Sequence, residues 1–345
     1  MTLRVVDSLG VDIGGNAQMF GDINGVCFMS DTTFVVFDRA YQHLRSYRID
    51  TSHIVTRSYL GAGPLEYLFS ENMSPFDSGF GLFEFEMPPR CVFFDSEAAP
   101  VGSVTLDEST ALVNPVFLGR DRIVGSVGGL YEENGSPAMK YEICIWDSQN
   151  GSREMVVHSV SRELGTVQEA YGRYVELEHC IETWRDSLIF VAPELEESRI
   201  LSFTTDGVCC DTITFEHIRE PRSSDEIKLE LIWRKLRDGN LGEWHPSELE
   251  PGITQLQVQD SLGLLWVCHG SLFSPEFEVF SVFGEFVFSC GVSGLPETDF
   301  YRFCISDHGY IAYTMYPADY PRIYMLELVE EAAVEGENEA ERHER

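Results

Sequence analysis

The feature that most constrains the fold is a strand pair that recurs along the chain. Each copy holds an apolar strand, a short turn and a second strand that ends in an aromatic residue and usually an aspartate, as in GLFEFE followed by RCVFFD. The second strands are counted from Leu44, Cys91, Ile143, Ile200, Phe277 and Ile323. The steps are therefore 47, 52, 57, 77 and 46 residues, close to the period of four-stranded propeller blades. The sequence predicts an all-β, six-bladed β-propeller.

Closure of such a ring requires that its last blade be tied to its first. The sixth copy supplies three clear strands, FYRFCIS, GYIAYTM and RIYMLEL, and needs a fourth. The segment Leu3–Asp7 has strand composition, so we expect it to complete the last blade in a 3+1 closure that removes exposed sheet edges. Because repeat folds grow by adding blades, we predict one domain over residues 1–329 and an acidic, flexible tail over residues 330–345.

The longest step contains an insertion over residues 217–250, between blades four and five. Within it, SSDEIKLELIWRKLRDG predicts a helix, because Ser223 and Glu226 fit a capping box. Leu229, Ile232 and Leu236 form one apolar stripe of this helix. The insertion is either a lid over one mouth of the channel or a cover for a blade edge, and most stripes of this kind serve simple packing.

Charge and hydropathy exclude two classes of partner. The chain has 24 Lys and Arg against 57 Asp and Glu, a formal net charge of −33, whereas phosphate binding needs a basic surface. We therefore expect no nucleic-acid partner. No stretch approaches the roughly 18 apolar residues of a membrane-spanning helix, and the opening MTLRVVDSLG lacks the features of a signal peptide.

The nine cysteines fall mostly inside apolar strand patterns, without a C-x-x-C pair or zinc-finger spacing. We expect buried free thiols. For the neighbours Cys209 and Cys210, alternation along a strand predicts one buried and one exposed thiol.

The segment GAGPLEY (Gly61–Tyr67), together with FGDINGV near the start and LQVQDSLGLLWV later, resembles the TolB-like six-bladed β-propeller proteins of bacteria. Leu65 occupies the place of a glycine in that family's turn. The resemblance implies the propeller fold, no assigned activity, and a location in the periplasm or at the cell surface, as for most members. The free cysteines favour the inside of the cell instead.

Charged residues at the turns of the first two blades are the candidate ligand-binding residues. A basic residue often precedes the third strand of a blade, as at His43, Arg90, Arg199 and Arg322. Asp38 and Glu86 are its expected acidic partners, in a repeated turn clamp or, alternatively, in a charged rim around the channel. A second cluster holds Arg39, Glu66, Glu84 and Glu86. The candidates for ligand binding are Arg39, Glu66, Glu86 and Arg90.

Function is weakly specified by these patterns, since propellers host many activities. We interpret the chain as a non-catalytic binding module for a protein or a small molecule, with no cofactor and no identifiable catalytic residue. The alternative is a Ca²⁺-dependent, lactonase-like hydrolase with its site in the central channel, because Ca²⁺ takes six to eight oxygen ligands. No matching metal motif is present in the sequence. A third possibility is an assembly role, in which the helix or a blade face docks a partner.

Overall fold

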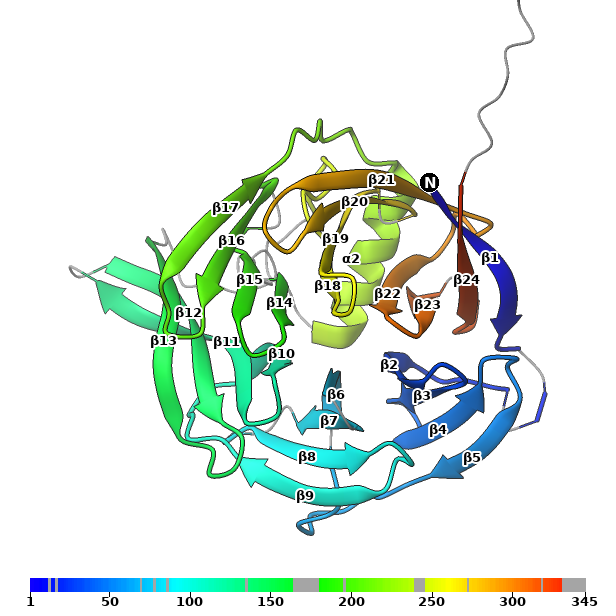
Figure 1. Cartoon of the computed structure of the whole chain (residues 1–345), viewed down its shortest axis with the longest axis horizontal. Helices are drawn as coiled ribbons and strands as arrows, with labels where there is room; N and C mark the ends of the chain where they lie inside the picture. Colours follow the sequence, from blue (N-terminus) through cyan, green and yellow to red (C-terminus); the bar gives the residue numbers. More distant parts are fainter. Residues whose placement is uncertain are drawn as a thin grey trace, which may run out of the picture.

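The computed structural model describes residues 1–11, 14–15, 18–68, 70–76, 79–84, 87–133, 136–163, 180–194, 197–238, 246–271, 273–317 and 319–330. Figure 1 shows strands arranged in groups around a common axis, in a propeller-like, all-β architecture. Of the predicted tail over residues 330–345, residues 331–345 lie outside the described residues.

Four of the sheets contain four antiparallel strands each, in chain order. Their strands are β2 (Ile23–Ser30), β3 (Thr33–Asp38), β4 (His43–Arg48) and β5 (His53–Arg57); β6 (Ser70–Phe76), β7 (Gly79–Glu84), β8 (Arg90–Asp95) and β9 (Pro100–Thr105); β10 (Leu112–Leu118), β11 (Arg122–Glu133), β12 (Ser136–Asp147) and β13 (Arg153–Glu163); and β14 (Cys180–Trp184), β15 (Leu188–Ala192), β16 (Arg199–Thr204) and β17 (Cys209–Thr214).

The remaining strands form one eight-stranded sheet, where the sequence had predicted two separate blades. Its strands are β18 (Gln255–Gln259), β19 (Leu264–Ser271), β20 (Ser274–Ser281), β21 (Phe286–Ser293), β22 (Phe300–Ser306), β23 (Gly309–Tyr316), β24 (Ile323–Val329) and β1 (Thr2–Leu9). As expected for the N-terminal segment, β1 pairs antiparallel with β24. It also pairs in parallel with β21, through Leu3 and Val292 among others, and this second pairing joins the two groups.

The innermost strands β2, β6, β10, β14, β18 and β22 contact one another in ring order. Between neighbouring groups lie hydrophobic clusters, so the inner strands of a sheet are buried on both faces. In one cluster Phe37 of β3 faces Phe80 and Phe94, whose rings stack with centroids 5.0 Å apart. The outermost strands are instead exposed, as in β5 and β17. This decrease in burial from the inner to the outer strands explains why the inner strands are continuous apolar runs in the sequence.

The predicted helix is present as α2 (Ser224–Asp238), and its start is capped as expected: the Glu226 backbone N–H donates to Ser223 Oγ at 3.1 Å. The predicted apolar stripe is buried only in part: Leu229 is half-buried. Ile232 is 58% exposed, whereas Glu226 and Glu230 are buried. The side chain of Leu236 lies outside the described residues.

The cysteine prediction is confirmed for seven thiols and wrong for one of the adjacent pair. Seven free cysteines are buried, while Cys209 and Cys210 are both exposed. The reason is their position on β17, the outermost strand of its sheet, where five of six residues are exposed. An edge strand of this kind offers little packing to either side chain.

Candidate functional site

A cavity of about 740 Å³ lies on the axis of the ring. Its wall is made by residues of the inner strands β2, β6, β10, β14, β18 and β22. Ligand pockets typically measure about 300–1,000 Å³ and combine apolar walls with a few placed polar groups. The size and position of this cavity make it the candidate site.

The innermost strand of each group has one backbone edge, on the side of the axis, that pairs with no other described strand. On β22, glutamine side chains of β18 form hydrogen bonds with part of this edge. Gln255 Nε2 donates to the Phe303 carbonyl at 2.6 Å, and Gln255 Oε1 accepts from the Phe303 N–H at 2.9 Å. Gln257 Oε1 likewise accepts from the Ile305 N–H at 3.2 Å. Because side chains alternate along a strand, the sequence QLQVQ places these amides on one face.

Glu182 of β14 continues this network from the neighbouring sheet. Gln257 Nε2 donates to Glu182 Oε2 at 3.3 Å, and the Thr183 N–H donates to Glu182 Oε1 at 2.9 Å. The side chain is half-buried and borders the cavity. Burial raises its pKa to about 8, the Thr183 N–H opposes this, and Asp260 adds to it. At neutral pH Glu182 is therefore an uncharged carboxyl group that can donate a hydrogen bond.

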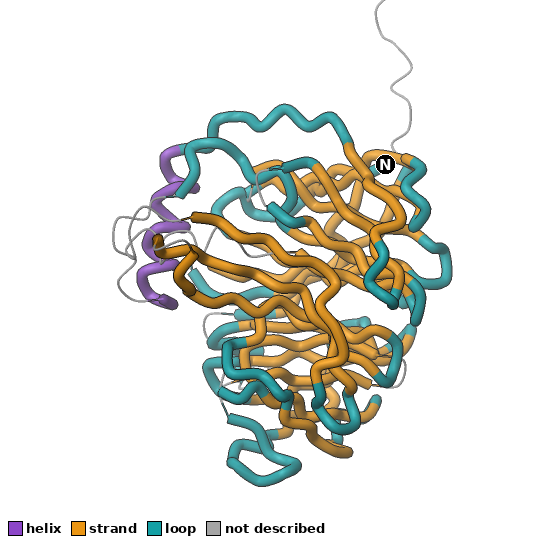
Figure 2. The backbone as a smooth tube through the Cα atoms, turned by 90° about the vertical axis from the view of Figure 1, so that its left-hand side faces the viewer, coloured by secondary structure: helices purple, strands orange, loops and turns teal. Residues whose placement is uncertain are grey.

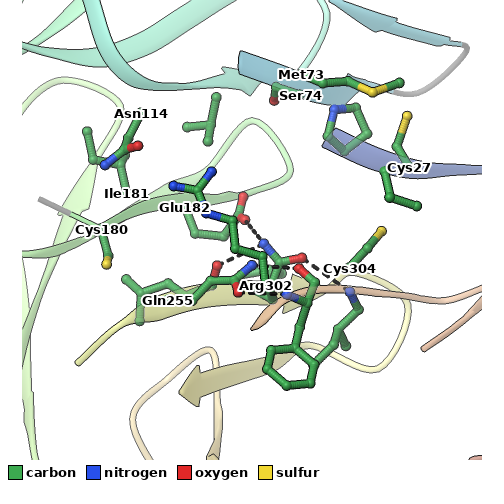
Figure 3. A pocket seen from close by; sticks show the side chains of 18 of the residues that line it. Cys27, Met73, Ser74, Asn114, Cys180, Ile181, Glu182, Gln255, Arg302 and Cys304 are labelled. Carbon is green, nitrogen blue, oxygen red and sulfur yellow. Dashed lines mark hydrogen bonds between the residues drawn. The ribbon is translucent and has the colours of Figure 1, made fainter. Parts of the chain in front are cut away.

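Polar and apolar side chains both border the cavity. Figure 3 shows Glu182, Gln255 and Arg302 grouped together, with the thiol of Cys27 and the side chain of Met73 farther from this group. Burial raises the pKa of the Cys304 thiol to about 12, and it raises that of Cys27 strongly as well. These thiols are protonated, apolar wall groups at neutral pH rather than nucleophiles.

The insertion covers one end of the cavity. In Figure 1 α2 lies over the part of the ring occupied by β18 and β22, and in Figure 2 it lies at one side of the strands. Residues of the insertion line the cavity: Arg219, Arg222, Glu230, Ser247 and Leu249. This placement favours a lid at the cavity mouth over a cover for a blade edge.

A buried ion cluster holds the helix in this position. Arg222 Nε lies 2.9 Å from Glu226 Oε1, and Arg222 Nη1 lies 2.7 Å from Glu230 Oε2. Glu226 Oε2 also accepts from Ser271 Oγ of β19 at 3.0 Å. The side chains of Arg222 and Glu226 are 3% and 2% exposed. The ion pairs therefore join α2 to the segment before it inside the insertion, and the hydrogen bond from Ser271 links the helix to β19.

The described part of the chain contains no group of three or more His, Cys, Asp and Glu side chains that could hold a metal ion. Within the same residues, no helix is long and apolar enough to cross a membrane.

Comparison with known proteins adds the fold. No family model matches the chain, and no curated protein matches it in sequence. A member of the DUF4221 family from Bacteroides vulgatus has a similar structure, with 7% identity, a TM-score of 0.55, and coverage of 94% of this chain and 97% of that one. A protein of unknown function from Bacteroides thetaiotaomicron aligns with 10% identity and a TM-score of 0.51, over 92% of this chain and 73% of that one. At such identities the likeness concerns the fold alone.

Of the candidates predicted from the sequence, the described residues Arg39, Glu66 and Arg90 are not part of the cavity wall. Arg39 Nη2 forms an ion pair with Asp22 Oδ2 at 2.6 Å. Glu66 Oε2 accepts from the Gly63 N–H at 2.8 Å, inside its own turn. Glu86 lies outside the described residues. A ligand role for the predicted set stays a prediction.

Arg90 braces the GAGPLEY turn. Its Nε donates to Glu84 Oε2 at 2.6 Å, while its Nη1 and Nη2 donate to the carbonyls of Gly63 and Glu66 at 3.0 and 2.7 Å. Leu65 is 45% exposed and is not among the residues with positive φ. The turn therefore accepts leucine where the TolB-like family has glycine.

The predicted pairing of Asp38 with His43 in a turn clamp is wrong, because Asp38 pairs with a different basic residue. Asp38 lies opposite His43 in the strand register, but its carboxylate pairs with Arg45, with Arg45 Nη2 3.0 Å from Asp38 Oδ2. The physical reason is burial: the Asp38 and Arg45 side chains are 0% and 3% exposed, and a buried carboxylate requires a fully charged partner.

Replacing Glu182 with glutamine is expected to remove one pH-dependent contribution to stability. Because its pKa is raised from 4.5 to about 8 in the folded chain, the folded state binds the proton more tightly than the unfolded state. Stability from this group is fully present below pH 4.5 and falls as the pH rises to about 8. Each tenfold difference in proton affinity between the two states corresponds to about 1.4 kcal/mol of unfolding free energy.

Urea denaturation at pH 5, 6, 7 and 8 measures this. The difference in unfolding free energy between Glu182→Gln and the wild type should shift in favour of the variant as the pH rises, while the exposed control Glu285→Gln should show no trend. A constant difference for Glu182→Gln across this range would contradict the assignment of a neutral carboxyl group.

Proposed function

We propose that this chain is a non-catalytic binding protein whose ligand is a small molecule held in the central cavity. The observation that carries the proposal is the cavity itself: about 740 Å³, walled by inner strands from every part of the ring and covered at one end by the insertion. Its mixture of apolar residues and a few hydrogen-bonding groups is typical of sites for small organic ligands.

We further propose that the sheets correspond to six blades with 3+1 closure. The eight-stranded sheet would then be two blades joined through their outermost strands β21 and β1. The ring order of the inner strands supports this count. The GAGPLEY turn supports the resemblance to TolB-like propellers, and with it a location in the periplasm or at the cell surface.

The uncharged fluorescent probe N-phenyl-1-naphthylamine tests the site. We expect one saturable binding site per chain. Met73 borders the cavity, so Met73→Trp should fill part of it and weaken probe binding about tenfold or more. Met87 is 70% exposed, and Met87→Trp is the matched control that should bind the probe as the wild type does.

Equal binding by the two variants would place the probe outside the cavity and overturn the proposal. Thermal melts of both variants accompany the titration, because a lost fold would also abolish binding. If Met73→Trp melts far below the wild type, Met73→Phe provides the same comparison with less added volume.

A further inference from the structure

Four arginines and four acidic residues are among the described residues that border the cavity. Arg302 of β22 borders the cavity, and no carboxylate of the described residues forms an ion pair with it. Its polar neighbour is Tyr313, directly opposite on β23. Burial raises the pKa of Tyr313 to about 12, against the lowering effect of Arg302, so this tyrosine is neutral at ordinary pH. Among the described residues, the Arg302 guanidinium therefore borders the cavity without an ion-pair partner.

The other arginines of the cavity have hydrogen-bond or ion-pair partners near its ends, including Arg219, whose Nη2 donates to Ser247 Oγ at 3.3 Å. At the end under the insertion, Arg222 is paired with Glu226 and Glu230. Beyond the last residues of β18 and β22, the Asp307 carboxylate accepts from the Ser261 N–H and Oγ, and Arg185 Nη2 donates to the Asp260 carbonyl at 3.4 Å. Arg302 is the third residue of β22 and Glu182 the third of β14, so both lie between these ends.

We propose that the cavity selects a small organic carboxylate with an apolar body, held through its carboxylate by the Arg302 guanidinium and the carboxyl group of Glu182. The inference rests on the proposed function, since it names the ligand class of the same cavity. The guanidinium offers two parallel N–H donors that match a carboxylate, and the uncharged Glu182 carboxyl group adds a third donor. The apolar body would contact the wall made by Phe28, Met29, Met73, Phe76, Phe117 and Met315.

The large negative charge of the chain does not oppose this selection at close range. The net charge of −33 is spread over the whole sequence, and at physiological salt exposed charges are screened beyond about 8–10 Å. Within the cavity, the charged group nearest to a bound ligand is the Arg302 guanidinium, which is positive. Selection between an anion and a cation of equal size is therefore set by Arg302.

Ionisation of Glu182 would place a second negative charge beside the bound carboxylate. Among the described residues of the neighbouring strands, β10 contributes no titratable side chain at Asn114–Phe117, and β18 contributes Gln257 and is followed by Asp260. β22, which does not adjoin β14 in the ring, contributes Arg302 and Cys304 to the cavity. The Asp260 carboxylate acts to raise the Glu182 pKa. Carboxylate binding should therefore weaken between pH 7 and pH 9.

The test displaces N-phenyl-1-naphthylamine with three probes of equal chain length: octanoate, octan-1-ol and octylamine. At pH 7 we expect octanoate to displace it with a Kd at least about tenfold lower than the other two. Arg302→Met should abolish this preference and still bind the fluorescent probe. Arg4, whose side chain is 57% exposed, gives the matched control Arg4→Met, which should keep the preference. Glu182→Gln should bind octanoate at pH 7 and lose the weakening between pH 7 and pH 9.

The failures of the two proposals are distinguishable. Binding of the fluorescent probe with equal displacement by all three competitors, or with a preference for octylamine, overturns the carboxylate inference and leaves the cavity site standing. Binding of neither the fluorescent probe nor octanoate overturns both. If Arg302→Met melts far below the wild type, Arg302→Lys replaces it: it keeps the charge without the planar fork and should weaken octanoate binding while leaving octanol unchanged.

Discussion

Deleting residues 1–9 is expected to lower the thermal midpoint by at least about 5 °C and to promote aggregation. The deletion removes β1, whose Leu3 is 0% and Leu9 7% exposed. Burial of each leucine contributes about 1.5–3 kcal/mol, and at this chain length 1 kcal/mol corresponds to roughly 1–2 °C. The deletion also frees the edges of β24 and β21, which β1 pairs on either side, and open edges recruit other chains.

A pair of point variants keeps this prediction testable if the truncated chain does not express. Leu3→Ala should cost about 2–5 kcal/mol, the usual range for a buried leucine. Val6, on the same strand, is 55% exposed, so Val6→Ala should cost well under 1 kcal/mol. A truncated chain with an unchanged melt, or equal effects of the two variants, would mean that β1 does not close the ring.

Arg45→Met is expected to destabilise the chain by about 3–5 kcal/mol at pH 7, because it leaves the buried Asp38 carboxylate without its counter-charge. The Asp38 oxygens would retain only backbone donors, from Gly21, Asp22 and Tyr41, at 3.1–3.4 Å. The Arg45 guanidinium also lies 5.0 Å from the centre of the Phe20 ring, a contact that methionine only partly replaces.

Equilibrium unfolding of Arg45→Met, Asp38→Asn and the double variant separates the effect of charge from the effect of packing. Burial already raises the pKa of Asp38, against the lowering effect of its donors and Arg45; without Arg45 it rises further. The cost of Arg45→Met should therefore shrink as the pH falls and Asp38 becomes protonated. The double variant Asp38→Asn, Arg45→Met should recover part of the loss. A pH-independent cost, or a double variant worse than the sum of its parts, would show that the ion pair is not the source.

Local patterns were sufficient for the propeller-like, all-β architecture and insufficient for the eight-stranded sheet and the site. Strand composition predicted β1 and its pairing with β24, and the Ser223–Glu226 spacing predicted the start of α2. These features depend on residues that are close in sequence or on simple alternation. The parallel pairing of β1 with β21 joins residues about 290 positions apart, as in Leu3 and Val292, and no local pattern encodes it.

The cavity residues were missed for a related reason. Glu182, Gln257 and Arg302 come from three different blade-like groups of strands, and each one alone resembles an ordinary solvent-facing strand position. Period-two spacing of the amides in QLQVQ was a usable signal, since three glutamines on one face of an inner strand need partners. The apolar stripe of α2 did not predict that Glu226 and Glu230 would be buried. Arg222, which neutralises them, precedes the helix, so the helix sequence alone does not show this pairing.

The measurement that tests the central claim most directly is the location of a bound ligand in the crystal. Crystals soaked with 1-bromonaphthalene, an uncharged probe with a bromine label, give an anomalous signal that marks its position. We predict one dominant bromine peak inside the ring, within contact of Met73 and Phe117. A dominant peak on the outer surface, for example against the exposed Phe283 and Phe286, with none in the cavity, would contradict a binding site on the axis of the ring.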